Sequence, residues 1–388
     1  MPAGPDVLPE AASGQENRKG KNNMSNIISV KQIARETLPK LIDNLVFPNL
    51  VYRDCGEGAA ARQGDSVLIR RPVKLAAEAF SSADGVTSQP IVEEAVEVKL
   101  DTLATVDAAI SAWDAYDDET IRRVFIEPAA AALAEKINRD GLALYKNVYQ
   151  TAGTPGTAPA GLDNLADASY ALDVAKVPTD RRAAVWSPMC TSRLKQIPAV
   201  VNAEKCGDTT ALRTGAIGQV FGVEHYMSQA ICQHTAGTLA GTSLSIRNGV
   251  ENADTCVLTA SSISGKTLKA GDILTVDGRN YTVTEDAAAA SSDITVKVSP
   301  AMTADAGAAV TVAASHEANL VFHPHAFAFV TRPLSAPAGV ESYVTTYNGI
   351  SLRVVRGYDI RYKREMLSMD VLYGFKAVYP ELAVRYMA

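Results

Sequence analysis

Apolar side chains after Ser29 recur at helical spacing, which predicts an amphipathic helix. The stripe consists of Val30, Ile33, Ala34, Thr37, Leu38, Leu41, Ile42 and Leu45. Ser29 and Gln32 have the spacing of a capping box, whereas Pro39 is expected to interrupt the helix and Pro48 to stop it. We interpret residues 24–63 as an amphipathic N-terminal arm, although an ordinary core helix would show the same periodicity.

Residues 64–107 are predicted to form a long two-stranded hairpin. Ser66–Arg70 is rich in β-formers, and residues 96–101 alternate between apolar and charged side chains. The connection at 81–90 is small, polar and turn-forming, and an isolated hairpin of this kind is marginal in water. Opposite charges lie on its two arms and could pair with each other or with a neighbouring copy of the chain: Arg70, Arg71, Lys74, Glu93, Glu94 and Glu97. Solvated strand faces would show the same charges, because exposed pairs contribute only about 0 to 1 kcal/mol.

A long helix is predicted within residues 108–160. Acidic residues at 117–119 favour a helix start, and Pro128 should kink or divide the helix near Glu127. The apolar face extends to about residue 150, and the whole helix would approach about 50 Å. This face consists of Ile121, Val124, Phe125, Leu133, Ile137, Leu144, Tyr145 and Val148.

A compact α+β unit is predicted for residues 161–236, after a loop of turn residues at 151–161. Leu162–Val174 has the pattern of a helix, and Arg182–Trp186 has that of a buried strand. Ser187 and Pro188 then begin a second helix that runs through Leu194.

Residues 237–316 form a separate all-β segment in this interpretation. From 238 to 315 the chain is almost all small or β-branched, with Tyr281 as the single aromatic residue. Asp277 and Gly278 separate two β-rich runs and predict a two-residue hairpin turn. A small barrel fits this length. Residues 317–388 return to β-rich runs at 326–330, 351–355 and 369–372, so the β segment interrupts a larger domain.

Composition places the chain among ordinary globular proteins of more than one compact unit. Of 388 residues, 47% are hydrophobic and 21% charged, with a mean hydropathy of +0.00. The net charge of -6 argues against broad binding to phosphate backbones. No apolar run is long enough for a bilayer, and the N-terminus lacks the apolar core of a secretory signal, so we expect a cytoplasmic protein.

The N-terminus and the cysteines add two expectations. Residues 1–23 are rich in Pro, Gly, Asn and charge and should be a disordered leader, and Met24 is a possible natural start. The five cysteines form no C-x-x-C pair and are expected to stay reduced: Cys55, Cys190, Cys206, Cys232 and Cys256.

Three short motifs have residue types that can support phosphate binding, metal binding or hydrolysis. Residues 264–267 (Ser-Gly-Lys-Thr) are similar to the end of a phosphate-binding loop, but the first glycine of that motif falls at Ala260. His323 and His325 would share one face of a strand without a third metal ligand at a convincing spacing. Cys190 and His225 lack any hydrolase motif around them. We therefore expect no catalytic, cofactor or metal site.

The order of the parts is more informative than any motif. It resembles the Hong Kong 97-type capsid fold of tailed bacteriophages and, within it, the coat proteins of short-tailed phages that carry a β-barrel insertion domain. The resemblance is carried by residues 26–28, 268–273, 319–324 and 369–374. It implies an α+β fold divided into an N-terminal arm (24–63), an extended hairpin loop (64–107), a spine helix with the peripheral domain (108–160), a first axial part (161–236), the insertion barrel (237–316) and the axial and peripheral return strands (317–388).

The resemblance also implies a function. A major capsid protein of this kind self-assembles into pentamers and hexamers that form the icosahedral head around double-stranded DNA. Its partners would be itself, a scaffolding protein and a portal protein, with DNA only in non-specific proximity and no membrane. It would be assembled in the cytoplasm of a host bacterium and reside in the virion. Two alternatives stay open: an encapsulin-like compartment shell, in which such a barrel is not familiar, and an enzyme or binding module, which would show a convergent polar pocket.

Overall fold

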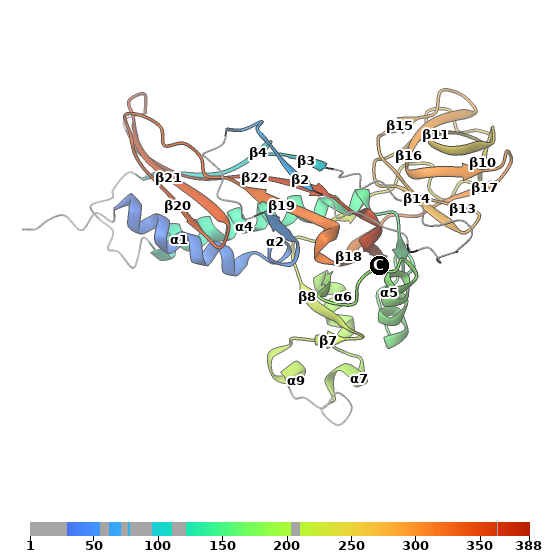
Figure 1. Ribbon diagram of the computed structural model, residues 1–388, viewed down its shortest axis with the longest axis horizontal. Coiled ribbons are helices and arrows are strands. Elements are labelled where there is room, and N and C mark those ends of the chain that lie inside the picture. Colours follow the sequence, from blue (N-terminus) through green and yellow to red (C-terminus); the bar gives the residue numbers. More distant parts are fainter. Residues whose placement is uncertain are drawn as a thin grey trace, which may run out of the picture.

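The structure is a computed structural model that describes residues 29–54, 62–70, 77, 95–110, 122–202, 210–362 and 364–388. It is elongated, with a helix-and-sheet body on the left, a lobe below and a barrel on the right in Figure 1. The predicted leader and the acidic helix start at 117–119 lie outside the described residues. The mixed α+β class predicted from the sequence is confirmed.

The body is a sheet covered by helices. Its strand order is β1-β19-β22-β21-β20, and β4 also pairs with β22. The bounds are β1 Tyr52–Asp54, β4 Thr102–Ile110, β19 Phe327–Thr331, β20 Glu341–Tyr347, β21 Ile350–Asp359 and β22 Arg364–Ala377. Helices α1 (Val30–Asn44) and α4 (Glu127–Leu142) lie below the sheet in Figure 1 and bury their apolar faces in one shared core. Aromatic rings such as Phe47, Phe327 and Phe329 fill that core.

The predicted stripe of α1 is confirmed, since all eight of its side chains are buried. Ser29 caps the helix by accepting a hydrogen bond from the Gln32 amide, but the Gln32 side chain donates to Glu36 instead of completing a capping box. The expected interruption at Pro39 is wrong. Because Pro39 lies on the exposed face, the carbonyl that loses its helical partner can face water. Pro48 does not stop α1 either, since the helix ends at Asn44 and Pro48 lies in the first turn of α2 (Phe47–Leu50).

The irregularity predicted near Glu127 is a change of helix type and not a break, because Ile126 keeps helical dihedral angles. A π-helical turn, η2 (Arg122–Ile126), leads into α4, and a 3-10 turn, η3 (Ala143–Asn147), ends it. The expected burial of Val124 is wrong: its side chain is 60% exposed, and Ile126 is buried in its place. A π turn holds more residues than an α turn, which rotates the apolar face by about one position.

We call residues 161–202 and 210–236 the lower lobe. Its helices are α5 (Leu162–Val174), α6 (Pro188–Leu194), α7 (Pro198–Val201) and α9 (Thr210–Thr214). They pack beside a sheet of order β5-β23-β18-β6-β8-β7, to which β9 adds through β18. The bounds are β5 Thr151–Ala152, β6 Arg182–Trp186, β7 Gly218–Val220, β8 Val223–Met227, β9 Gln233–His234, β18 His316–Phe322 and β23 Ala383–Met387. The predicted α5, β6 and α6 are confirmed, and Ser187 caps α6 as its sequence suggests.

A closed barrel stands between β9 and β18 in the chain, in the order β10-β11-β16-β14-β13-β17. The bounds are β10 Leu244–Ile246, β11 Val250–Thr259, β13 Ile273–Val276, β14 Arg279–Val283, β16 Asp293–Ala304 and β17 Ala309–Val312. Short strands β12 (Thr267–Leu268) and β15 (Ala287–Ala288) form a separate pair. The predicted two-residue turn is confirmed, because Asp277 and Gly278 have φ values of 48° and 75° between β13 and β14. Apolar side chains inside the barrel form a core of its own.

Candidate assembly surface

The predicted hairpin is present at its base. Strands β2 (Ser66–Arg70) and β3 (Ala95–Lys99) pair antiparallel, with Ser66 opposite Lys99. Ile69, Val98 and Leu100 are buried against apolar residues of β19 and β22. Gly374 of β22 passes so close that a Cβ there would stand 2.1 Å from the Lys99 carbonyl oxygen. The base of the hairpin is therefore held by its own subunit.

The charged residues of the hairpin are only partly described. Glu97 is exposed and lies opposite Leu68 in the register. The backbone of Arg70 ends β2 opposite Ala95, but its side chain lies outside the described residues. Arg71, Lys74, Glu93 and Glu94 lie outside them as well, together with the predicted tip at 81–90. A contact through these charges stays a prediction.

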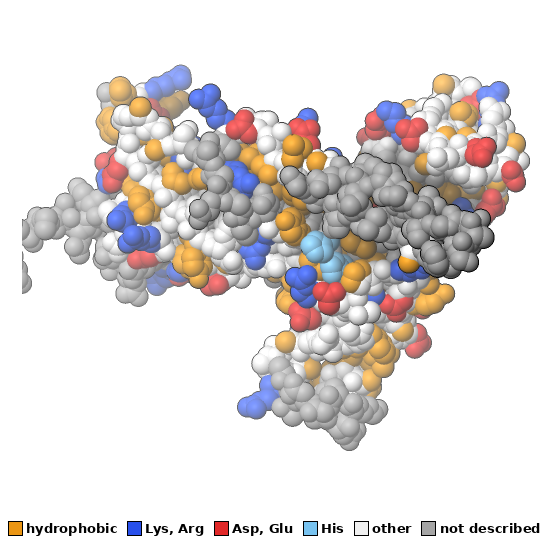
Figure 2. All heavy atoms as spheres, in the orientation of Figure 1, with side chains coloured by type: hydrophobic (Ala, Val, Ile, Leu, Met, Phe, Trp, Pro, Cys, Tyr) orange, Lys and Arg blue, Asp and Glu red, His pale blue; other side chains and the backbone are white. Residues whose placement is uncertain are grey.

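Exposed apolar side chains gather at the free end of β20, β21 and β22. We call this group the tip patch: Val340, Tyr358, Ile360 and Tyr362. The guanidinium carbons of Arg361 and Arg364 stand 5.4 and 5.1 Å from the Tyr362 ring centroid. Figure 2 shows orange and blue side chains together at this upper-left end. This surface was not predicted from the sequence, and the signal that could have indicated it is the alternation of Tyr, Ile and Arg over residues 358–364.

Further exposed apolar side chains are distributed over several elements of the lower lobe. We call these side chains together the lobe patch: Tyr170, Val174, Met189, Leu212, Phe221, Tyr226 and Met227. The barrel differs from both regions, because no large hydrophobic side chain is exposed anywhere between 244 and 312, all of which the structure describes. Large exposed apolar groups mark interaction sites more often than single scattered ones do. The tip and the lower lobe are thus the stronger candidates for contacts with other molecules.

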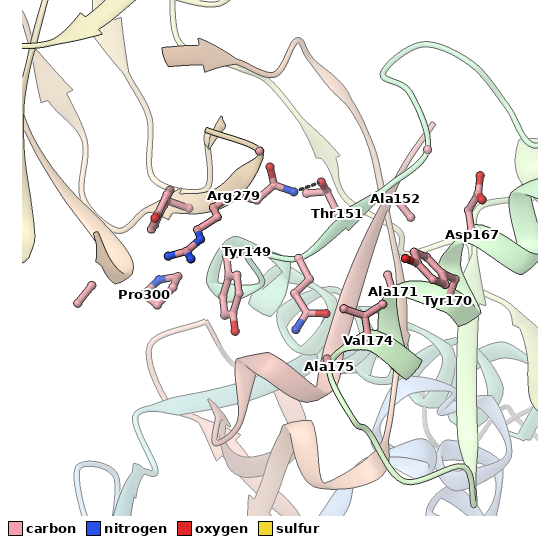
Figure 3. A pocket seen from close by; sticks show the side chains of 16 residues that line it. Tyr149, Thr151, Ala152, Asp167, Tyr170, Ala171, Val174, Ala175, Arg279 and Pro300 are labelled. Carbon is pink, nitrogen blue, oxygen red and sulfur yellow. Dashed lines mark hydrogen bonds between the residues drawn. The ribbon is translucent and has the colours of Figure 1, made fainter. Parts of the chain in front are cut away.

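A groove of about 710 Å³ separates the barrel from α5. Figure 3 shows Asp167, Tyr170 and Val174 on the α5 side and Arg279 and Pro300 on the barrel side. Asn280 of the barrel donates from Nδ2 to Thr151 Oγ1 at 2.7 Å between them. Of the residues that line the groove, Asp167 and Arg279 alone are charged, and they come from opposite walls. This is not the convergent set of acids, bases and nucleophiles that an enzyme would need.

The barrel is joined to the body by a buried polar network. Asp272 is fully buried and accepts hydrogen bonds from His234 Nε2 at 2.8 Å and from the Gly237 and Lys269 amides at 3.1 and 2.8 Å. His234 Nδ1 lies 3.1 Å from the Tyr145 hydroxyl of η3. The free-energy cost of removing a carboxylate from water is offset only where its hydrogen-bond partners are held in a good geometry. Asp272 therefore links the barrel to the segment that leads into it, through His234 and Gly237.

Arg385 of β23 forms the other half of this network. Its buried guanidinium donates to His316 Nε2 at 2.9 Å and to the Gly271 carbonyl at 2.7 Å, and it lies over the Tyr145 ring. Burial lowers the pKa of Arg385 to about 10. Burial first, and then the charge of Arg385, lower the pKa of His316 to about 4. His316 is therefore neutral at neutral pH and acts as an acceptor for Arg385.

The phosphate-loop and histidine motifs do not form sites in the described part of the chain. Strand β12, not a helix, follows the Gly265-Lys266 turn, so no helix N-terminus faces that loop. The expected placement of His323 and His325 on a strand face is wrong, because Pro324 starts a 3-10 turn (Pro324–Ala326) after β18. Their ring centroids are 5.2 Å apart. Across the described ranges, no three His, Cys, Asp or Glu side chains are placed to hold a metal ion.

The remaining candidates are structural. His225 accepts from Trp186 Nε1 at 2.8 Å, while Cys190 is buried near Glu317. Cys190, Cys232 and Cys256 are free thiols, and burial raises the pKa of each, whereas Cys55 and Cys206 lie outside the described residues. Among the described helices, none has the length and apolar character needed to cross a bilayer.

Comparison with known structures gives weak similarity to several capsids. The protein titled Mycobacterium phage Che8 shares 18% identity, with 88% of this chain and 90% of that chain covered and a TM-score of 0.48. The capsid of cyanophage P-SCSP1u shares 15% identity over 89% and 88%, also at 0.48. The virus-like particle from Pyrococcus furiosus shares 8% over 92% and 98%, at 0.40. Scores below 0.5 do not carry an assignment.

The family comparison is stronger. No curated protein matches the chain. Residues 22–302, well over half of the chain, match the family described as P22 coat protein, gene protein 5. The α+β architecture with a closed barrel agrees with the Hong Kong 97-type fold that the sequence resemblance implied. The chain therefore belongs to the P22 coat protein family and is a phage major capsid protein.

Proposed function

We propose that this capsid protein assembles as pentamers and hexamers into the icosahedral head that encloses the double-stranded DNA of a tailed phage. Membership in the P22 coat protein family is the observation that carries the proposal. A scaffolding protein and a portal protein are the expected partners, and the host bacterial cytoplasm is the expected place of assembly. No observation favours an encapsulin-like shell, since the match is to a phage coat family.

Exposed apolar side chains supply the driving force in this proposal. The tip patch and the lobe patch lie on different parts of an elongated subunit, so one copy can contact several neighbours. Burial of apolar surface contributes roughly 25 cal/mol per Å² before the cost of association is subtracted. Each contact can be weak, because a closed shell repeats it around every subunit.

The charges of the hairpin would add specificity to these apolar contacts. Arg70, Arg71 and Lys74 precede the connection, and Glu93, Glu94 and Glu97 follow it. Opposite charges on a neighbouring copy would fix the register of the contact more than its affinity. The barrel would support the subunit from outside the principal contacts, because it exposes no large hydrophobic side chain between 244 and 312.

The proposal assigns no reaction to the chain and only non-specific proximity to DNA. The net charge of -6 disfavours tight phosphate binding on an inner surface. The groove at α5 has one acid and one base on opposite walls, and we assign it to assembly instead of catalysis.

Electron microscopy of the purified full chain, with sedimentation velocity at increasing protein concentration, tests the proposal. We expect capsomers or closed shells to appear above a threshold concentration. A chain that stays monomeric at every concentration, with and without a co-expressed scaffold, would refute it. Turnover of a substrate at the groove that saturates with substrate concentration would favour an enzyme instead.

A further inference from the structure

Helix α5 presents a stripe of residues that its own subunit does not use. Asp163, Asp167, Tyr170 and Val174 follow one another at spacings of four, three and four, so they share one face. All four are exposed, and Tyr170 and Val174 are 69% and 63% exposed. The opposite face of the helix is buried in the lobe through Leu165, Ala168 and Leu172. Asp163 alone would suit a helix N-terminus, but a large aromatic and a valine gain nothing from water.

Phe221 adds a second anomaly beside the same helix. It lies in the turn between β7 and β8 with φ = 50°, a left-handed conformation that is rare for a bulky side chain. Its carbonyl accepts a hydrogen bond from Ser169 Oγ of α5 at 3.3 Å, so the turn is fixed against the helix. The side chain is nevertheless 52% exposed. A strained backbone at Phe221 that leaves its aromatic ring in solvent suggests that the ring contacts another molecule.

Among the described residues, the other edge of the lobe is also apolar but carries the opposite charge. Leu212 on α9 is 71% exposed, and the neighbouring Arg213 is exposed too. Lys195 lies beside them, since its Nζ stands 3.1 Å from the point where a Cβ on Gly215 would be. Figure 1 places α9 and α5 at opposite edges of the lobe. In Figure 2 blue side chains project at the α9 edge, while red and orange ones lie along the α5 edge.

We infer that the α5 edge of one copy docks on the α9 edge of a second copy of this chain. Arg213 would pair with Asp167, and Leu212 would enter the groove beside Tyr170 and Val174. Both the charges and the apolar groups of the two edges are then complementary. Different patches meet in such a contact, so it is head-to-tail, and repetition with a fixed rotation closes a ring.

This inference rests on the proposed shell assembly and names the surfaces that join neighbours within one ring. It differs from a contact through the hairpin charges, which belong to residues 70–97 on another part of the subunit. It also explains why the groove carries an acidic and apolar wall instead of a convergent polar one.

Charge exchange in the full chain tests the pairing. The variants are Asp167→Arg, Arg213→Asp and the two together, with Glu251→Arg on the exposed surface of the barrel as the matched control. Each single reversal should place like charges together and raise the concentration at half-assembly by about tenfold or more. The double variant restores opposite charges and should return to within about threefold of the natural chain. Thermal melts of the unassembled chains establish that every variant is folded.

The outcomes separate the inference from the proposed function. Single reversals that assemble like the control, or a double variant no better than either single one, would overturn the α5–α9 contact while shells of the natural chain still form. Failure of the natural chain to assemble would overturn both. If a single reversal is unfolded, Leu212→Ser supplies the same test from the apolar side, with normal assembly as the contrary result.

Discussion

Nε of Arg385 donates to Nε2 of His316 at 2.9 Å, although the two residues are far apart in the chain and both are buried. The His316 ring must therefore carry its proton on Nδ1, which faces the Ala314 carbonyl at 2.6 Å. A second proton, on Nε2, would place that N–H against the Nε–H of Arg385, so two donors would face each other where the barrel joins the body. The geometry and the pKa of about 4 agree that His316 is neutral in the folded protein.

The free energy of unfolding should decrease as the pH falls, because His316 binds a proton at a higher pH in the unfolded chain than in the folded one. His316 has a pKa near 6.5 when unfolded and about 4 when folded. Its contribution is complete above about pH 6.5 and is lost between about 6.5 and 4, with a total of about 3 kcal/mol. His225, whose pKa burial lowers to about 4, acts in the same range. His316→Gln should reduce the slope measured by urea unfolding across this range, and an unchanged slope would contradict the assignment.

Asp272→Asn should destabilise the joint between barrel and body. The new amide group would turn a donor toward one or more of the donors on His234, Gly237 and Lys269. We expect a loss of about 3 kcal/mol in the free energy of unfolding, as for a broken buried pair. Asp305→Asn, on the exposed surface of the barrel, should change it by less than about 0.5 kcal/mol. Equal denaturant midpoints for the two variants would refute the role of Asp272.

Residues 237–316 should fold without the rest of the chain. The barrel is closed and has its own apolar core, which includes Leu258, Val283 and Val296. The isolated segment should therefore melt cooperatively in circular dichroism, and Leu258→Ala should cost about 2 to 5 kcal/mol. A disordered spectrum of the natural segment would show that the body is needed for its fold.

Reversal of Arg70 and Arg71 to Glu should weaken assembly more than folding. If the hairpin lies on a neighbour, like charges then meet, and even about 1 kcal/mol per contact is a fivefold change in its equilibrium constant. The melting temperature of the monomer should barely change, since surface substitutions usually stay within about 0.5 kcal/mol. Sedimentation beside a thermal melt measures both quantities. Normal shells at normal protein concentrations would show that these charges play no part in assembly. A lower melting temperature without an assembly defect would indicate that they make contacts within the chain.

Phe221→Asn should separate stability from assembly. Asparagine tolerates the left-handed conformation better than phenylalanine, so the monomer should gain up to about 1 kcal/mol in the free energy of unfolding. The same change removes an exposed aromatic ring from the α5 edge and should raise the assembly threshold. Urea unfolding measures the stability, and sedimentation velocity measures the assembly threshold. A variant with unchanged stability and an unchanged threshold would show that Phe221 is neither strained nor in contact.

Local patterns were enough to predict several elements with their bounds. Helix α5, strand β6 and the cap of α6 by Ser187 follow from periodicity and capping within a few residues. The Asp277-Gly278 turn follows from the positive φ that glycine accepts. The order of these elements along the chain also carried the family resemblance, which the match over residues 22–302 supports.

The tertiary structure decided what depends on distant contacts. Pro39 lies within a helix because packing places it on the exposed face, and a π turn buries Ile126 where periodicity favours Val124. No local pattern could pair Arg385 with His316 or Asp272 with His234, because these partners are separated by long stretches of chain. Side-chain burial likewise selects which apolar residues stay exposed at the tip and the lower lobe. Propensity acts between neighbours in sequence, whereas buried polar pairs and docking surfaces exist only after the chain has folded.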